Sequence, residues 1–192
     1  MHGEDVRGTE AGVKLTWDDY ALFPDDGQRH ELIEGERYVT PAPVRKHQMI
    51  VVNIVTAIRS HLKQHPLGFV YVAPFDVILS NYDVVEPDVL YVSRERAQEI
   101  EMSPWVKGAP NLVVEVGSPG TRKRDETTKR LLYERYGVDE YWLVDTEIDA
   151  IAVLRRSGDR FEFAMELRRG DELLTTPLLP DWSLPLREVF EE

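Results

Sequence analysis

The sequence predicts an α/β protein whose mixed central sheet is flanked by helices, with additional β-hairpins toward the N-terminal and C-terminal ends. Two amphipathic segments with helical periodicity alternate with short runs of β-branched and aromatic residues. One of these runs, residues 111–116, is almost wholly apolar, which is typical of a strand covered on both faces. We therefore expect this strand at the centre of the sheet.

The length and composition of the chain set its domain organisation. With 192 residues and 42% hydrophobic content, the chain can bury one core of ordinary size, so we expect a single domain over residues 15–192. Residues 1–14 are mostly polar and lack periodicity, which predicts a disordered tail. No apolar run approaches the roughly 20 residues of a membrane helix, and the first residues lack a secretion-signal pattern. We expect a cytoplasmic protein without a membrane partner.

The charge balance and the absence of cysteine restrict the chemistry. A chain without Cys has no disulfide, thiolate zinc site or cysteine nucleophile, so any metal must be held by oxygen or imidazole ligands. The net charge of −12 argues against a simple nucleic-acid binder, because Lys and Arg supply most of the affinity for phosphates. Metal ions can screen an acidic cleft, however, and basic residues cluster at residues 122–124 and 129–130. A nucleic-acid substrate therefore remains compatible with the composition.

The N-terminal third predicts a short helix, a hairpin and one long helix. Thr16 can cap the short helix, with Asp19 completing a capping box. Residues 29–40 predict two short strands around the turn at Glu34-Gly35. The long helix is expected over residues 46–64, because six apolar residues recur there at helical spacing. They are Ile50, Val51, Ile54, Val55, Ile58 and Leu62.

The middle of the chain predicts two strands and two helices. Residues 69–79 and 84–92 are rich in β-branched and aromatic residues around a turn, so we expect adjacent antiparallel strands. The polar segment 93–108 predicts a short helix before the central strand. Thr121 is placed to cap a helix that runs to Tyr136, and Gly137 is placed to end it.

The C-terminal part predicts more strands and then irregular structure. Strands are expected at residues 141–144, 150–154 and 161–167, and the last two form a hairpin across Ser157-Gly158-Asp159. The remainder contains Pro177, Pro180 and Pro185 and is expected to be mostly irregular.

Two acidic residues stand in otherwise apolar predicted strands. Asp88 follows Pro87, and Glu115 is the only charge in residues 112–116. A buried carboxylate costs several kcal/mol unless it is paired or binds a cation. Asp88 is therefore either a strand-end acid facing water or a metal ligand, and Glu115 is either the partner of a buried arginine or a metal ligand.

Lys129 in the following helix has two interpretations. Asp125 precedes it by four residues, the favourable order for a surface ion pair of about 0.2–0.5 kcal/mol. Lys129 also shares a helix face with Leu132 and Tyr136, which we expect to face the core. An inward lysine needs an anion, and two acids on adjacent strands would supply it. Near a metal, such a lysine can orient an attacking water or stabilise phosphate charge.

These residues resemble a known nuclease pattern. Pro87-Asp88, Glu115 on the next core strand and a lysine are similar to the PD-(D/E)xK motif, although Gly117 stands where that motif places its lysine. The role would then pass to Lys129. A wider match covers His30-Glu31-Leu32-Ile33-Glu34-Gly35-Glu36, His47, Glu86-Pro87-Asp88-Val89, residues 110–116, Ser118-Pro119, Asp125, Lys129 and residues 136–142. Together these segments resemble the Uma-type family of restriction-endonuclease-like proteins.

The resemblance implies a restriction-endonuclease-like fold with an active site at Asp88, Glu115 and Lys129, and Glu31 as an additional acid. It implies Mg²⁺ or Mn²⁺ as the cofactor, held by Asp88 and Glu115. Glu31 is equally explained as an exposed cross-strand charge.

Four further residues are auxiliary candidates. His47 either contacts phosphate and assists proton transfer or is a surface histidine. Asp125 accompanies Lys129 on the same helix face. Arg122 and Lys123 either contact a phosphate backbone or belong to a solvated loop.

Two functions follow as hypotheses. The first is a metal-dependent phosphodiester hydrolase, a DNA endonuclease that uses the two carboxylates and the helix lysine. The second is a catalytically inactive protein of nuclease fold that binds a partner or assembles with itself, in which the polar trio is only a buried ion network. Edge strands in the C-terminal hairpin would suit a homodimer.

Overall fold

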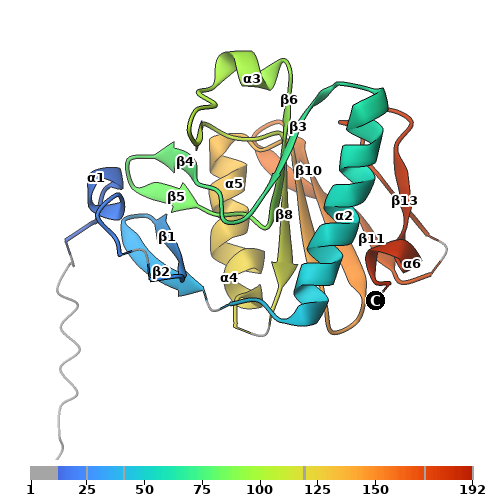
Figure 1. Ribbon diagram of the computed structural model, residues 1–192, viewed down its shortest axis with the longest axis horizontal. Coiled ribbons are helices and arrows are strands. Elements are labelled where there is room, and N and C mark those ends of the chain that lie inside the picture. Colours follow the sequence, from blue (N-terminus) through green and yellow to red (C-terminus); the bar gives the residue numbers. More distant parts are fainter. Residues whose placement is uncertain (1–12, 25, 41, 119, 171, 192) are drawn as a thin grey trace, which may run out of the picture.

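The computed structural model describes residues 13–24, 26–40, 42–118, 120–170 and 172–191. Nearly all of the expected N-terminal tail lies outside these ranges. Figure 1 shows an α/β arrangement in which helices flank β-sheets, as the sequence predicts. In the described part of the chain, every helix is too short or too polar to cross a membrane.

The larger sheet has six strands in the order β11-β10-β9-β8-β6-β3. They are β3 (Gly68–Val72), β6 (Val89–Ser93), β8 (Leu112–Gly117), β9 (Glu140–Asp145), β10 (Ala150–Ser157) and β11 (Arg160–Arg168). β8 and β9 run parallel and the other neighbours run antiparallel, so the sheet is mixed. β8 lies inside the sheet, and its first five residues are buried, which confirms its expected central position.

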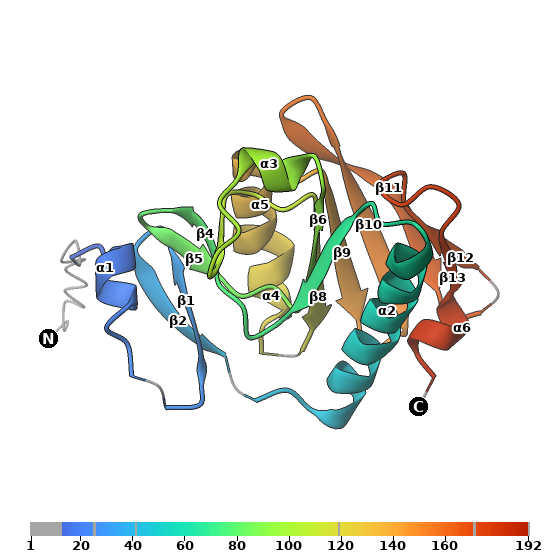
Figure 2. The ribbon, with the colours of Figure 1, turned by 45° about the horizontal axis from the view of Figure 1, so that its top comes forward.

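Helices cover both faces of this sheet. Figure 2 shows α2 (Arg45–Gln64) on one side, and α4 (Arg122–Arg124) and α5 (Arg130–Tyr136) on the other. Successive β8 residues face opposite sides, so Val114 packs in the core beneath α2 while Val113 packs with the core beneath α5. The long helix agrees with its predicted bounds, and its buried face follows the predicted apolar spacing.

The smaller sheet has five short strands in the order β2-β1-β5-β4-β7. They are β1 (Arg29–Ile33), β2 (Glu36–Thr40), β4 (Val77–Ser80), β5 (Asp83–Val85) and β7 (Val106–Lys107). The predicted hairpin around Glu34-Gly35 is confirmed, since β1 pairs antiparallel with β2. The short helix α1 (Trp17–Tyr20) packs beside this sheet and begins with the predicted capping box between Thr16 and Asp19.

The expected strands at residues 69–79 and 84–92 each divide into two. β3 pairs with β6 in the larger sheet, whereas β4 pairs with β5 in the smaller one. The prediction of one antiparallel pair is therefore wrong in its extent. The chain returns to the larger sheet through Glu86-Pro87-Asp88, where proline removes a donor that a continuous strand would need. Asp88 consequently lies between the two sheets.

The predicted helix after Thr121 forms, but with a wide turn in its middle. Between α4 and α5, residues Asp125–Lys129 form the π-helical segment η1. Gly137 ends the helix with a φ of +88°, as its position predicts. The prediction that Thr121 caps the helix is wrong in one respect: its hydroxyl makes no cap hydrogen bond and instead accepts one from the Ser118 amide at 3.3 Å.

The C-terminal part is more ordered than its prolines predict. The hairpin of β10 and β11 is confirmed and forms an edge of the larger sheet. After it come β12 (Leu173–Thr175), β13 (Ser183–Pro185) and α6 (Leu186–Val189). Earlier in the chain, the short helix predicted within residues 93–108 is α3 (Arg96–Glu99). Trp182 and Phe190 join the core beneath α2. These last residues therefore complete the hydrophobic core.

Candidate active site

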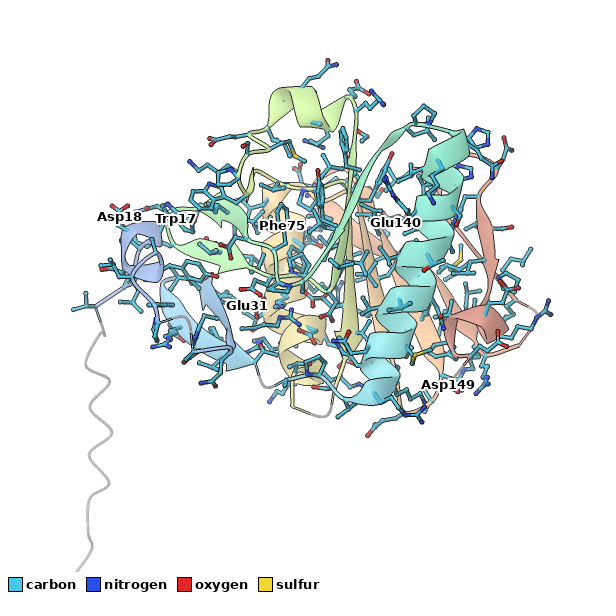
Figure 3. The ribbon with its side chains drawn as sticks, in the orientation of Figure 1. Trp17, Asp18, Glu31, Phe75, Glu140 and Asp149 are labelled. Carbon is cyan, nitrogen blue, oxygen red and sulfur yellow. The ribbon has the colours of Figure 1, made fainter. Side chains whose placement is uncertain are left out.

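A cavity of about 170 Å³ lies where the two sheets and two helices meet. Asp88, Glu115, Asp125 and Lys129 line it, together with His47 from the start of α2. Glu31 comes from β1 behind this cavity, and Figure 3 shows it between the N-terminal hairpin and the helix of α4 and α5. The structure thus brings together six predicted site residues from five separate segments.

Lys129 is buried among the acids and is 2% exposed. Its Nζ lies 2.6 Å from Glu31 Oε1 and 2.9 Å from Glu115 Oε1, but 4.0 Å from Asp125 Oδ1. The main partners of Lys129 are therefore acids on two strands of different sheets. The interpretation of Lys129 as half of a solvated surface ion pair with Asp125 is wrong, because Lys129 is buried and Asp125 is its most distant acid. Burial opposes the charge on Lys129, but the carboxylates of Glu115 and Glu31 outweigh it and raise its pKa.

Asp125 and Lys129, four residues apart at the two ends of the wide turn η1, both point inward. Asp125 is 3% exposed and Lys129 is 2% exposed, while Glu126 and Thr127 between them are exposed. A π-turn carries one residue more than an α-turn, and such turns are frequent at functional sites. Both side chains line the cavity together with Glu115.

Asp88 is held by three donors. Arg29 Nη1 lies 2.8 Å from Oδ1, while His47 Nε2 at 3.0 Å and the Val116 amide at 2.8 Å both reach Oδ2. Burial opposes ionisation of Asp88, but the His47 hydrogen bond and the Arg29 charge lower its pKa to about 2. Asp88 is therefore ionised at neutral pH. It is not a strand-end acid facing water, because it is only 5% exposed.

Glu115 has the opposite electrostatic environment. Burial raises its pKa, Lys129 opposes this shift, and the neighbouring charges of Asp125, Asp88 and Glu31 reinforce it. The two hydrogen bonds that it accepts from described side chains, from Lys129 at 2.9 Å and from the Tyr133 hydroxyl at 2.7 Å, both reach Oε1. Its Oε2 is the oxygen that remains for a further partner.

The donor set fits a magnesium-type cation. Four carboxylates gather here, from Glu31, Asp88, Glu115 and Asp125, against the close positive charges of Lys129 and Arg29. Within the described ranges no three Asp, Glu or His side chains are grouped to enclose a metal ion. Mg²⁺ commonly uses only one or two carboxylates and completes its shell with water and phosphate oxygens. Asp88 and Glu115 are the two that would hold it.

Three residues that contact the site acids had no role predicted from the sequence. Arg29 covers Asp88 and also contacts the Glu86 carboxylate at 3.5 Å and its carbonyl oxygen. Arg124 lies 3.6 Å from Glu31 Oε2, and Tyr133 bonds to Glu115. Arg124 belongs to the basic run at residues 122–124. Tyr133 follows Lys129 by four residues in the same predicted helix. No local sequence pattern indicates Arg29.

Arg122 and Lys123 are not brought to the cavity. Arg122 is paired at 2.7 Å with both Glu126 and Asp145, and Lys123 is exposed on the outer side of the helix. Their neighbour Arg124 turns inward, with its guanidinium 5.0 Å from the Tyr38 ring.

The fold and this acidic cavity define a nuclease-like α/β protein. A crystal structure from Anabaena variabilis, described as "a putative nuclease belonging to DUF820", has the same fold with a TM-score of 0.76. The two sequences are 22% identical, and the match covers 92% of this chain and 97% of the other.

The family follows from the sequence. The profile of the Uma2 family, described as "Putative restriction endonuclease", matches residues 17–187, so the chain belongs to the Uma2 family. This confirms the resemblance drawn from the motifs. No curated protein matches the sequence.

Proposed function

We propose that this protein is a metal-dependent phosphodiester hydrolase that acts as a DNA endonuclease. The observation that carries the proposal is the meeting of Asp88, Glu115 and Lys129 at one cavity, from segments up to 41 positions apart. The nuclease-like family and fold support the same reaction class.

Mg²⁺ or Mn²⁺ would be held by Asp88 and Glu115 and, when bound, would acidify a coordinated water and offset phosphate charge. Asp88 enters this role already ionised, because its donors lower its pKa. Glu115 would offer Oε2 to the cation, since Lys129 and Tyr133 both bond to Oε1. A cation beside Glu115 would favour the ionised carboxylate that burial disfavours.

Lys129 would orient Glu115 and place a positive charge where a phosphodiester approaches. Glu31 fixes Lys129 from the opposite side at 2.6 Å and is the additional acid of the site. Arg29 is a positioning residue for Asp88 in this structure. His47, whose Nε2 bonds to Asp88, orients that carboxylate from the α2 side.

The test is cleavage of plasmid and single-stranded DNA in Mg²⁺ or Mn²⁺, with EDTA as the metal-free reference. We expect Asp88→Asn, Glu115→Gln and Lys129→Ala each to reduce cleavage at least about a hundredfold, because each removes a charge at the reacting centre. Unchanged cleavage in these variants would refute the assignment.

A matched control is Glu140→Gln. Glu140 is a buried carboxylate on β9, the strand beside β8. It does not line the cavity, and its Oε2 lies 3.2 Å from Arg155 Nε. We expect this variant to keep its cleavage activity. Loss of activity in Glu140→Gln equal to that in Glu115→Gln would trace both losses to folding, so circular dichroism accompanies each assay.

A second candidate is a binding protein without catalysis. Lys129 already neutralises two acids and Arg29 already covers Asp88, which is what a structural ion network requires. Calorimetric titration with Mn²⁺ separates the two, because a structural network alone binds no cation. Heat of binding that disappears in Asp88→Asn favours the hydrolase.

A further inference from the structure

A second pocket lies beside α1, at the end of the smaller sheet. It has a volume of about 410 Å³, and we call it the α1 pocket. Figures 1 and 2 both show α1 on the far side of the molecule from α2, and no described residue lines both this pocket and the cavity of the candidate active site. Four aromatic rings and two acids are among the residues that line it: Tyr20, Phe23, Phe75, Trp105, Asp76 and Glu86.

The Tyr20 hydroxyl of this pocket has three acceptors around it. Its oxygen lies 2.7 Å from Asp76 Oδ1, 3.0 Å from the His30 carbonyl oxygen and 3.3 Å from Glu86 Oε1. A tyrosine hydroxyl has a single proton, so it can donate a full hydrogen bond to only one of them. Asp76 is the nearest of the three. A bond donated to Asp76 leaves Glu86 Oε1 without this donor.

Glu86 has fewer donors than its burial requires. It is 7% exposed, and its Oε2 accepts no hydrogen bond within the described residues. Arg29 Nε lies 3.5 Å from this oxygen, but Arg29 also pairs with Asp88 at 2.8 Å, so one cation is shared by two acids. A buried carboxylate that lacks donors is costly, and it indicates a further partner that supplies them.

The other acid of the α1 pocket also lacks a cation. Within the described residues, Asp76 forms no ion pair. His30 is the basic side chain that lines the pocket, and both of its ring nitrogens are engaged, with Asp26 at 3.0 Å and Arg37 at 3.1 Å. The described lining residues therefore present two carboxylates without a cation to neutralise them.

Asp83 shows that an acid beside a tyrosine can have all the donors it needs. The Tyr136 hydroxyl donates to Asp83 Oδ2 at 2.7 Å, the same distance as between Tyr20 and Asp76. The Ser80 hydroxyl donates to the same oxygen at 2.6 Å, and the Glu34 amide donates to Oδ1 at 2.8 Å. Both oxygens of Asp83 thus have donors, which Glu86 in the α1 pocket does not achieve.

We propose that the α1 pocket binds a primary ammonium group, carried by a small amine or by a lysine side chain. An ammonium brings a positive charge and three N–H donors, and it can serve both acids because Asp76 and Glu86 reach the same hydroxyl. The aromatic rings attract a cation through their negative faces and cover its alkyl chain. A quaternary ammonium would satisfy the rings but would bring no donor to the acids.

Isothermal titration calorimetry in EDTA tests this with butylammonium, tetramethylammonium, butanol and Nα-acetyl-lysine methylamide. We expect butylammonium to bind at least about tenfold more tightly than tetramethylammonium, and butanol to give no saturable heat. A lysine derivative that binds as tightly as butylammonium assigns the pocket to a protein side chain, and weaker binding of it assigns the pocket to a free amine. No saturable binding of either amine would overturn the proposal, because a proton on one acid would then satisfy the pair.

Variants locate the binding. Asp76→Asn and Glu86→Gln should each weaken butylammonium binding about tenfold, because each removes one negative charge from the ammonium site. Trp105→Leu should weaken it about threefold through lost cation–π attraction. Circular dichroism verifies that each variant is folded.

The matched control is Asp83→Asn, since Asp83 is a buried acid bonded to a tyrosine that does not line the α1 pocket. We expect it to bind butylammonium as the unchanged protein does. Equal weakening by Asp83→Asn and Asp76→Asn, or unchanged binding in Asp76→Asn and Glu86→Gln, would overturn the proposal. The titration contains neither metal nor DNA, so its result is independent of the proposed hydrolase.

Discussion

Lys129 compensates the negative charge of two buried acids in the candidate site. It is buried between Glu31 and Glu115, and removing one partner of a buried ion pair leaves the others uncompensated. We expect Lys129→Met to lower the free energy of unfolding by about 3–5 kcal/mol at pH 7. Urea denaturation measures this change.

The companion variant removes the uncompensated charge. Adding Glu31→Gln to Lys129→Met should recover part of the lost stability, because one fewer buried carboxylate then lacks a cation. If Lys129→Met unfolds at the same urea concentration as the unchanged protein, Lys129 does not hold these acids in solution.

Glu86 makes stability depend on pH. Burial raises its pKa from 4.5 to about 7, while Arg29 opposes the shift. A carboxyl with a raised pKa holds its proton more tightly when folded, so its ionisation costs folding free energy. This cost is absent below about pH 4.5, grows as the pH rises and is complete above about pH 7.

Glu86→Gln should therefore gain stability over the unchanged protein as the pH rises. Thermal unfolding should give nearly equal Tm values at pH 4.5 and a higher Tm for the variant at pH 7.5. A Tm difference that is constant between these pH values, or that has the opposite sign, contradicts the raised pKa.

The predictable site residues are those that break a local pattern. Asp88, Glu115 and Lys129 each stand where an apolar residue is expected, so the sequence marks them. Glu31 lies in β1, which pairs on its other side with the distant strand β5, so its burial could not be predicted from the local hairpin alone. Arg29 is an ordinary residue at a strand start, and only the folded chain brings it to Asp88, 59 positions away.

At the scale of elements, the helix that ends at Gly137 depends on a left-handed residue. Gly137 has a φ of +88°, and an added Cβ would meet only Arg156 Nη2 at the ordinary distance of 3.9 Å. Gly137→Ala should therefore destabilise the protein by about 1 kcal/mol through its backbone alone.

Gly170→Ala is the matched control, because Gly170 has no positive φ and its added Cβ would lie 3.8 Å from the nearest atom. Its free energy of unfolding should be unchanged or slightly higher. Equal losses in both variants would mean that the left-handed conformation is not the cause.

Helices and hairpins with a regular sequence pattern were predicted well, but the sheet in which each strand pairs was not. The spacing of apolar residues defines α2, and the glycine turn defines the hairpin of β1 and β2. Nothing in residues 69–79 indicates that β3 and β4 join different sheets. The β propensity of a segment favours a strand, but it does not specify with which strand that segment pairs. The π-turn was missed for a similar reason, since its inward acid and lysine also fit α-helical spacing.

At the scale of the whole molecule, the last segment closes the core beneath α2. Trp182 is 6% exposed, and its ring stacks on Trp142 with centroids 5.9 Å apart. We expect Trp182→Ala to cost about 3–5 kcal/mol in urea denaturation. Leu173→Ala, at a side chain that is 50% exposed, should cost less than about 0.5 kcal/mol. A similar small loss in both variants would place the C-terminal segment outside the cooperative core.

The interleaved order of the site segments has a consequence for how the protein is made. Arg29 is synthesised about a hundred residues before Lys129, and β9, which pairs with the strand of Glu115, follows later still. A growing polypeptide on the ribosome therefore carries scattered charges and no assembled centre. The candidate site can therefore assemble only after translation has passed β9.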